Sequence, residues 1–378
     1  MNTITILSPA HPLRGGIAAY SERLAKAFMD EGKTVDIVSF SLQYPGFLFP
    51  GTTQFSSDPA PEGLRIRTWV NSVNPLNWIK VGLRLRAEKP DLIIVRYWLP
   101  FMGPCLGTIL RLAKGNGHTR VVAVVDNLIP HESRPGDRWF TRYFIKPVDA
   151  CVAMSAAVER DIRAMAPEKP VRYIPHPVYD NYGAAVDQAV GKAHLHLDPD
   201  FSYLLFFGFI RDYKGLDLLL EAMADPRIRE RPIRLIVAGE YYGKREYYED
   251  LIERLQIAHQ LVLRTDFIPL ETVKYYFAAA DLVVQPYRSA TQSGISQIAY
   301  HFNKPMIVTR VGGLPEIIED GKEGYLVEVS PEAIATAIAE VYDKDELPAL
   351  TAAVMARKHQ FSWENMVAGI LEMAHPQP

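Results

Sequence analysis

The sequence predicts an α/β protein built from two doubly wound, Rossmann-like domains. Short apolar runs rich in Val, Ile and Leu alternate with amphipathic segments along most of the 378 residues, as in parallel strands joined by helices. A polar stretch at residues 181–200 interrupts this alternation. Glycine-containing loops follow several of the apolar runs, at the strand ends where open parallel sheets bind ligands.

The first alternating series predicts an N-terminal domain over residues 1–180. Its expected strands lie at 3–7, 35–39, 92–95, 121–125, 150–154 and 171–174, and its expected helices at 16–31, 75–88, 104–114, 136–146 and 156–165. Each strand is a short apolar run, and each helix separates two of them. Residues 181–200 are expected to be a linker.

The second series predicts a C-terminal domain over residues 201–360. Its expected strands lie at 204–207, 233–238, 261–263, 282–285 and 306–308, and its expected helices at 245–256, 270–279 and 293–302, with further helices to residue 358. Ser362 is placed to cap a last helix at residues 363–374, because serine favours the N-cap position.

Residues 205–221 carry the first signal for an anionic ligand. Gly208 follows an apolar strand and allows a sharp turn, and Arg211 and Lys214 then stand at the mouth of a leucine-rich helix. Free N–H groups and the helix dipole favour an anion at that place. The alternative is that the two cations are an ordinary solvated helix start.

A second signal lies in residues 281–316, which read as strand, polar glycine loop, helix, strand, glycine loop and helix. Ser293 and Gly294 open one helix with small residues that let a ligand approach its amides, and Gly312 and Gly313 do so one unit later. Glu316 opens the following helix, where an acid in the first turn is favoured by the helix dipole. Two such loops beside two cations suggest a nucleoside diphosphate.

Over nearly its whole length the chain resembles the retaining, nucleotide-sugar-dependent glycosyltransferases of family four, which have the GT-B fold. The matching segments are Arg14-Gly-Gly-Ile17, Ser155, Ile174-Pro-His-Pro-Val178, Arg211 with Lys214, Val237-Ala-Gly-Glu240, and residues 280–284, 311–316 and 320–324. The resemblance implies an acceptor domain and a nucleotide-sugar domain facing across a cleft. It also implies that residues 361–378 cross back onto the N-terminal domain.

The resemblance further implies an activity and a set of site residues. The enzyme would move a sugar, with retention and without metal or cofactor, to a saccharide or lipid-linked acceptor in cell-surface polysaccharide or glycolipid biosynthesis. Arg211 and Lys214 would neutralise the leaving diphosphate. The donor would be held by Gly15, Gly16, Gly208, Glu240, Phe267, Ile268, Gln292, Ser293, Gly294, Gly312, Gly313 and Glu316.

Asp126 and His131, near the end of strand 121–125, are further catalytic candidates, because polar residues at strand ends usually face a ligand. A turn at Asp126 and a loop histidine bonded to backbone remain the alternatives.

One departure from the family is clear. The family carries two glutamates eight positions apart across the donor loop, and the matching positions hold Ala290 and Ile298. This leaves two alternatives to a transferase: a nucleotide-sugar-binding accessory protein with impaired catalysis, and a sugar-nucleotide epimerase. An epimerase would need acid and base carboxylates facing the donor, which Ala290 and Ile298 do not provide.

Composition limits the partners. The net charge of −3 gives no global basic field for nucleic acid. Cys105 and Cys151 lack metal-site spacing and are expected to be buried reduced thiols, as in a cytoplasmic protein. No run reaches ~18 apolar residues, so no membrane span is expected. Residues 78–89 place cations between apolar positions, as in either a solvated helix or one touching the inner membrane face.

Overall fold

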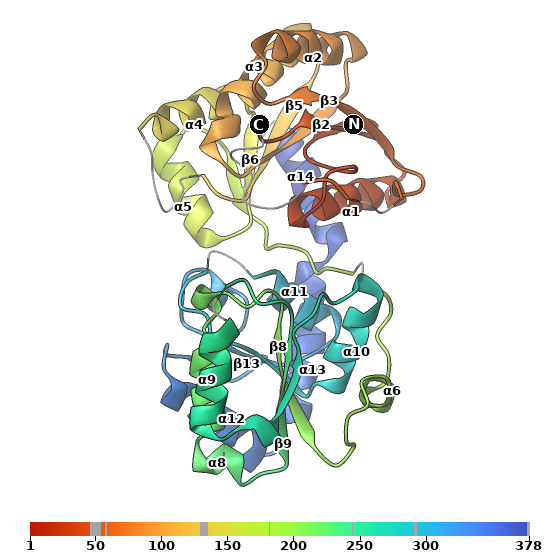
Figure 1. Ribbon diagram of the computed structural model, residues 1–378. Helices are drawn as coiled ribbons and strands as arrows, with labels where there is room; N and C mark the ends of the chain where they lie inside the picture. The colour runs from red at the N-terminus through yellow and green to blue at the C-terminus, as the bar shows by residue number, and fades with distance from the viewer. Residues whose placement is uncertain are drawn as a thin grey trace. The chain divides into compact units, whose positions relative to one another are not determined.

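The computed structural model describes residues 1–45, 54–56, 59–128, 135–180, 182–243, 245–290 and 293–375. The chain divides into two compact units (Figure 1). Unit 1 comprises Met1–His176 and Trp363–Pro378, and unit 2 comprises Pro177–Ser362. Each unit is a parallel sheet with helices on both faces, which confirms the predicted fold class.

The sheet of unit 1 has the strand order β3-β2-β1-β4-β5-β6-β7. Its strands are β1 (Thr3–Leu7), β2 (Thr34–Leu42), β3 (Arg65–Asn71), β4 (Leu92–Tyr97), β5 (Arg120–Val125), β6 (Ala150–Ala153) and β7 (Val171–Tyr173). All neighbours pair in parallel, and the order reverses between β1 and β4. That reversal is the topological switch point of unit 1.

Helices cover both faces of this sheet. One face carries α1 (Gly16–Asp30) and the C-terminal α14 (Trp363–Ala374). The other carries α2 (Pro75–Glu88), α3 (Gly103–Ala113), α4 (Asp137–Ile145) and α5 (Ala156–Met165), with short 3-10 turns at Pro100–Met102 and Lys114–Asn116. The central strands β1, β4, β5 and β6 are almost entirely buried on both faces, as a doubly covered parallel sheet requires.

The sheet of unit 2 has the order β10-β9-β8-β11-β12-β13, again all parallel. Its strands are β8 (Ser202–Phe207), β9 (Ile233–Ala238), β10 (Leu261–Arg264), β11 (Leu282–Gln285), β12 (Met306–Thr309) and β13 (Gly324–Val327). The order reverses between β8 and β11, where Leu204 pairs with Leu282. The carboxyl ends of these two strands are therefore the expected ligand edge of unit 2.

Two helical layers enclose this second sheet (Figure 1). One contains α7 (Leu216–Met223), α8 (Pro226–Arg229), α9 (Arg245–Leu255) and α12 (Pro331–Asp343). The other contains α6 (Gln188–His194), α10 (Val273–Ala279) and α11 (Gly294–His301). Val354 of α13 (Leu347–Arg357) packs in the same hydrophobic core. The 3-10 turns are Asp212–Lys214, Ala258–Gln260, Leu270–Thr272, Leu314–Glu316 and Lys358–Phe361.

The structure differs from the sequence expectation in four elements. The helix expected to begin at Glu316 is not formed, because Glu316 ends the 3-10 turn Leu314–Glu316 and the described residues 317–323 contain no helix. Residues 181–200, expected as a linker, contain α6, which packs on α10 so closely that a Cβ on Gly191 would lie 2.7 Å from the Ala279 nitrogen. The edge strands β3 and β13 were not expected. Charged residues alternate along β3, and Arg67 pairs with Asp36 of β2 at 3.1 Å, so its stability depends on a partner distant in sequence.

Both cysteines are buried and free, as predicted. Burial raises the pKa of the Cys151 thiol to about 12. Within the described ranges, no helix combines the length and the apolar character that crossing a bilayer would require.

Candidate functional site

Two loops meet at the switch point of unit 2. The loop after β8 begins at Gly208, whose φ of 94° favours glycine, and leads into the 3-10 turn that ends at Lys214. The loop after β11 begins at Pro286. A Cβ on Gly215 would lie 2.1 Å from the Pro286 carbonyl oxygen. The two loops are therefore in direct backbone contact.

Lys214 is a buried cation inside this pair of loops. Lys214 is only 8% exposed. Its Nζ lies 5.6 Å from the centroid of the Tyr287 ring. It also lies close to Gly208, because a Cβ atom added to that glycine would be 2.8 Å from Nζ. Burial, followed by the charge of Arg211, lowers the lysine pKa to about 8. In the part of the chain that the structure describes, Nζ has no hydrogen-bond or ion-pair partner. A buried, unpaired cation is expensive unless an anion joins it.

Arg211 stands at the start of the same loop and is exposed. Its guanidinium carbon lies 4.3 Å from the Tyr242 ring centroid, and no carboxylate among the described residues pairs with it. The aromatic contact holds the cation without neutralising it. The structure therefore places the two predicted cations together on one loop.

The first turn of α11 lies beside Lys214. Gly208 lies between the two: a Cβ atom added to this glycine would be 2.8 Å from Lys214 Nζ and 3.4 Å from Cδ1 of Ile295, a residue of the first turn of α11. Ser293 is the N-cap of this helix but makes no side-chain capping hydrogen bond, and Gly294 is the first helical residue. The backbone N–H groups of a first helical turn have no acceptor within the helix, so they add to the local preference for an anion.

Gln285, which sequence reasoning did not select, organises this region from the end of β11. Its side chain is almost completely buried, and its Oε1 accepts hydrogen bonds from Ser293 Oγ at 2.5 Å and from Ser296 Oγ at 3.0 Å. Ser293 also bonds the hydroxyl of Tyr287, whose pKa is raised by burial. In the sequence, the one feature that could have pointed to Gln285 is its position as a polar residue at the end of an apolar strand, just before a glycine-containing loop.

The second glycine loop packs directly on the donor loop. Gly312 has φ 51°, and a Cβ there would stand 1.5 Å from the Ala290 carbonyl oxygen, which also accepts a hydrogen bond from the Gly313 N–H at 3.2 Å. Glu316 ends the 3-10 turn that follows. Gly312 is therefore required for loop packing, whether or not it also approaches a ligand.

Ala290 and Ile298, the two positions at which the family resemblance implied glutamates, take part in packing. Ala290 supplies the carbonyl oxygen in that loop contact, and Ile298 is 3% exposed within the core of unit 2. Beside it, the buried Gln297 Oε1 has no hydrogen-bond partner among the described residues. Gln292, one of the predicted donor ligands, lies outside the described residues.

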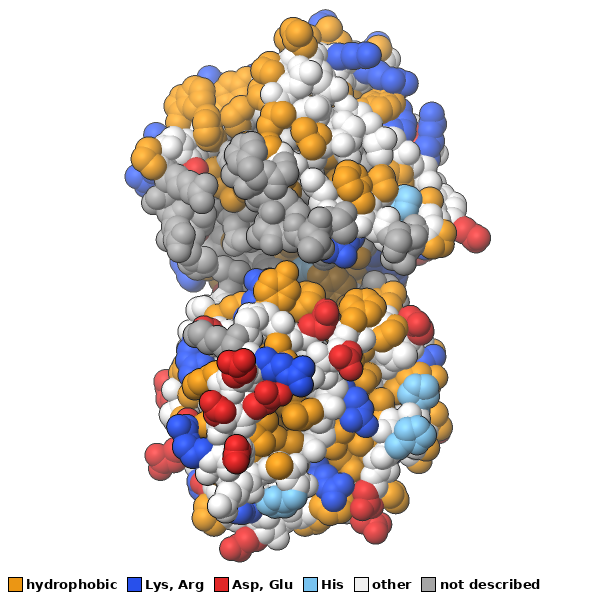
Figure 2. All heavy atoms as spheres, in the orientation of Figure 1, with side chains coloured by type: hydrophobic (Ala, Val, Ile, Leu, Met, Phe, Trp, Pro, Cys, Tyr) orange, Lys and Arg blue, Asp and Glu red, His pale blue; other side chains and the backbone are white. Residues whose placement is uncertain are grey.

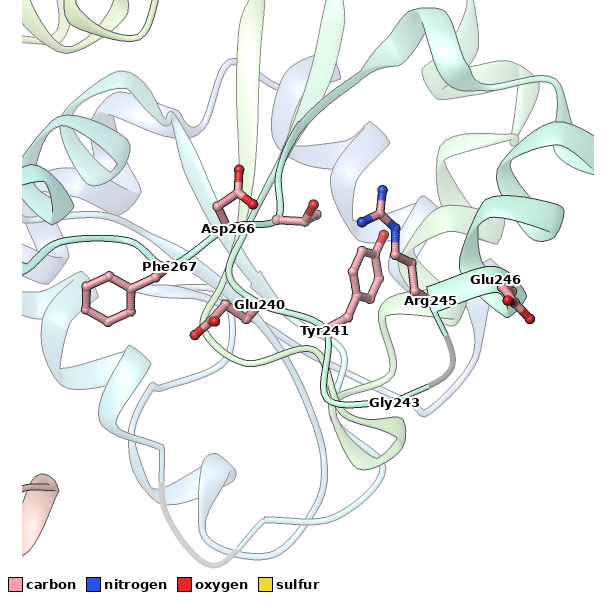
Figure 3. Close-up of a pocket in the computed structure, with 8 residues that line it drawn as sticks. Glu240, Tyr241, Gly243, Arg245, Glu246, Asp266 and Phe267 are labelled. Atoms are coloured by element: carbon pink, nitrogen blue, oxygen red, sulfur yellow. The ribbon is translucent and has the colours of Figure 1, made fainter. Parts of the chain in front are cut away.

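A cavity of about 590 Å³ opens at the ends of β9 and β10. It is lined by Glu240, Tyr241, Gly243, Arg245, Glu246, Thr265, Asp266 and Phe267. In Figure 3, Glu240 and Phe267 lie on one side, and Tyr241 and Arg245 on the other. Phe267 is 69% exposed, and the adjacent Ile268 packs on the core. The carboxylates of Glu240 and Asp266 have no hydrogen-bond or ion-pair partner in the described ranges.

This cavity neighbours the loop that carries Lys214. A Cβ on Gly239, directly before Glu240, would lie 2.4 Å from the Gly208 carbonyl oxygen. The loops after β8 and β9 are therefore in backbone contact, so the predicted donor residues of both loops belong to one continuous edge of unit 2.

In unit 1, Asp126 directly follows β5 and forms an ion pair with Arg96 of β4. Arg96 Nε donates to Asp126 Oδ2 at 3.0 Å, and its Nη2 contacts Oδ1. Burial raises the Asp126 pKa, and Arg96 opposes that change. Both carboxylate oxygens are engaged, which favours a structural role for Asp126. His131 lies outside the described residues. Gly15 (φ 113°) precedes α1, which begins at Gly16.

Both halves of the chain match known sequence families. Residues 14–181 match the family described as Glycosyltransferase Family 4, and residues 202–344 match Glycosyl transferases group 1. A D-inositol 3-phosphate glycosyltransferase of Segniliparus rotundus is 34% identical over 190 residues, which are 49% of this chain and 42% of that protein. The chain therefore spans less than half the length of this relative.

Two further likenesses cover more of the chain. An uncharacterized glycosyltransferase of Methanocaldococcus jannaschii is 27% identical over 78% of both chains. Among solved structures, Anabaena HepE in complex with UDP and glucose is similar, with a TM-score of 0.67, 16% identity, and coverage of 98% of this chain and 100% of that one. At this identity the structural likeness concerns the fold alone.

Proposed function

We infer that this chain, which belongs to the family-four glycosyltransferases (Glycosyl transferases group 1), transfers a sugar from a nucleoside-diphosphate sugar to a saccharide or lipid-linked acceptor. The observation that carries this proposal is Lys214, a buried and unpaired cation beside the open first turn of α11. HepE, a protein of similar fold, is described in complex with UDP-glucose, which supports the same class of donor. Biosynthesis of cell-surface polysaccharide or glycolipid is the proposed context.

The proposed chemistry places the leaving diphosphate at the switch point of unit 2. As the bond between the sugar and the diphosphate breaks, negative charge grows on the phosphate oxygens. Lys214, Arg211 and the first-turn amides of α11 would stabilise that charge, and preorganised charges of this kind are usually the largest catalytic contribution. Transfer without a metal ion and with retention of anomeric configuration, both implied by the family resemblance, are part of the proposal.

The cavity beside the Lys214 loop suggests which base the donor carries. Its unpaired Glu240 and Asp266 carboxylates can only accept hydrogen bonds. Guanine presents two adjacent N–H donors on one edge, whereas uracil presents one N–H between two carbonyl oxygens, which a carboxylate repels. The exposed Phe267 ring can stack on either base. We therefore propose a guanosine diphosphate sugar as the donor.

The test is to incubate the protein with GDP-, UDP- and ADP-sugars, with and without EDTA, and to measure released nucleoside diphosphate. We expect GDP release from at least one GDP-sugar, undiminished by EDTA. NMR of the isolated product should show the anomeric configuration of the donor. The Lys214→Met protein serves as the control for contaminating hydrolase activity.

Two outcomes would contradict parts of this proposal. Nucleotide binding without release from any donor, tested with a range of saccharide and lipid-linked acceptors, would favour the accessory-protein alternative that Ala290 and Ile298 raise. Faster release from a UDP-sugar than from every GDP-sugar would leave the transferase proposal intact but remove the assignment of guanine.

We also propose that unit 1 contacts an anionic membrane through α2. The exposed face of this helix, the α2 surface, consists of Leu76, Ile79, Lys80, Leu83 and Arg84. Leu76 is 78% exposed, and Ile79 and Leu83 are about half exposed. Figure 2 shows hydrophobic and basic side chains next to one another over α2 and α3. Apolar residues flanked by cations are the composition of interfacial helices.

Co-sedimentation with vesicles tests the α2 surface. Wild-type protein should pellet with vesicles containing phosphatidylglycerol and not with phosphatidylcholine alone, because the cations require anionic lipid. The triple change Leu76→Ser, Ile79→Ser and Leu83→Ser should reduce the bound fraction several-fold, as about 0.8 kcal/mol is lost per buried methylene. Met355→Ser, an exposed apolar residue on α13 of unit 2, is the matched control. Equal binding by triple variant and control would refute the proposal.

A further inference from the structure

Ser293 occupies the N-cap position of α11, yet its hydroxyl does not cap the helix. Two other serines in this chain show the ordinary behaviour. Ser155 accepts a hydrogen bond from the Val158 N–H at the start of α5, and Ser330 accepts one from the Ala333 N–H at the start of α12. All three serines have extended backbone conformations. The ψ angle of Ser293 is 115°, against 153° at Ser155 and 148° at Ser330, and its side-chain surroundings also differ.

Gln285 accounts for that difference. Ser293 Oγ lies 2.5 Å from Gln285 Oε1, and Ser296 Oγ, one turn into the helix, lies 3.0 Å from the same oxygen. The glutamine is 1% exposed, and its Nε2 lies 3.6 Å from Met306 Sδ. A buried amide is costly unless its oxygen is hydrogen-bonded, so the two serine hydroxyls are held toward Gln285.

A cation without a negatively charged partner among the described residues lies near the first turn of α11, whose amide groups Ser293 leaves open. Lys214, more than nine-tenths buried and without a hydrogen-bond or ion-pair partner in the described residues, lies beside Ile295 of the same first turn. The uncapped amide groups and the unpaired ammonium group both donate hydrogen bonds and both favour negative charge, so a single anion can bind to both.

We propose that Gln285 is a positioning residue, which holds the Ser293 hydroxyl away from the first turn of α11 and so keeps its amide groups open for the diphosphate of the donor. This inference rests on the proposed function. It adds a role for a residue that does not itself touch the ligand, and it predicts an intramolecular competitor for the phosphate. When Gln285 no longer accepts its hydrogen bond, the Ser293 hydroxyl keeps only its contact with the Tyr287 hydroxyl and can turn to cap α11 as Ser155 caps α5.

The test measures the affinity for GDP, with UDP in parallel, by isothermal titration calorimetry. Gln285→Met keeps the length of the side chain and removes the acceptor. We expect its dissociation constant to rise about fivefold, the factor that corresponds to a typical N-cap interaction. The Ser293 hydroxyl, expected from the sequence to hold the donor, is instead bonded to Gln285 within the protein. The double variant Gln285→Met/Ser293→Ala lacks this competing hydroxyl and should recover most of the lost affinity.

The matched control is Gln285→Met/Ser296→Ala, which removes the other serine bonded to the same oxygen. Ser296 lies within the helix and cannot occupy its N-cap, so this variant should stay as weak as Gln285→Met. A merely structural role of Gln285 would not distinguish the two serines. Circular dichroism checks folding. If Gln285→Met does not fold, Gln285→Asn is used instead, alone and in both double variants. Its side chain is one methylene shorter, which moves the acceptor oxygen away from Ser293.

Three results would overturn the proposal: unchanged affinity in Gln285→Met, equal affinities in the two double variants, or stronger recovery with Ser296→Ala than with Ser293→Ala. Failure of the wild-type protein to bind either nucleotide would instead refute the proposed function, on which this inference depends.

Discussion

The Lys214→Met variant is expected to release nucleoside diphosphate at least about 100-fold more slowly than the wild type, the usual cost of removing one preorganised stabilising group. The change removes a buried cation that has no partner in the described protein and that lies beside the first turn of α11. Initial rates at saturating donor concentration give the comparison. A rate within a few-fold of the wild type would remove Lys214 from the leaving-group site.

Stability separates this loss from unfolding. Burial lowers the Lys214 pKa, so the fold is strained by the charged amine. Methionine fills a similar volume without charge, and the melting temperature of Lys214→Met should therefore equal or exceed that of the wild type. A marked fall in melting temperature would mean that the rate reports damage to the fold.

The pH dependence of binding provides a second readout of the same residue. With a pKa of about 8, Lys214 in the free protein loses its charge as the pH rises through that value. Because the diphosphate binds the charged amine, its affinity should fall by about twofold between pH 7 and 8 and then more steeply, approaching tenfold per pH unit. Lys214→Arg stays charged and should lack this decline. A flat profile for the wild-type protein would contradict the assignment.

The Arg96→Met variant should lower the free energy of unfolding of unit 1 by about 3–5 kcal/mol, the range measured when one partner of a buried ion pair is removed. Arg96 is 2% exposed, and its guanidinium carbon lies 3.8 Å from the Tyr20 ring centroid. Tyr20 of α1 in turn packs against Trp363 of α14, with ring centroids 5.0 Å apart. The change leaves the Asp126 carboxyl, whose side chain is 18% exposed, without its cation.

Urea unfolding followed by tryptophan fluorescence measures this loss in unit 1 alone. The five tryptophans, at positions 69, 78, 98, 139 and 363, all belong to unit 1. The double variant Arg96→Met/Asp126→Leu should regain most of the stability, because apolar replacement of both partners of a buried pair is often neutral. If the double variant is no more stable than Arg96→Met, the stabilisation by Arg96 does not depend on Asp126.

Much of this fold could be predicted because buried parallel strands leave a direct mark on the sequence. The run at 204–207 and those like it are apolar on both faces, and the elements between them repeat at helical spacing. The missed elements lack that mark. Strand β3 carries Arg65 and Arg67 and depends on Asp36 of β2, and α6 depends on the close contact of Gly191 with α10.

The candidate site shows the same division between local and tertiary information. Arg211 and Lys214 could be selected because a glycine turn and two cations stand together in the sequence, and the structure does place them on one loop. The role of Gln285 could not be predicted. It depends on the end of β11 meeting a helix eight residues later, and a glutamine that ends an apolar strand has no distinctive pattern.

The backbone contacts of Gly215 with Pro286 and of Gly312 with Ala290 limit how this protein can be redesigned. Adding even a methyl group at either glycine would push neighbouring segments apart, so random libraries that include these positions would mostly yield misfolded clones. Altered donor preference is better sought at side chains that project from the segments, such as Phe267 or Glu240, while the backbone framework stays constant.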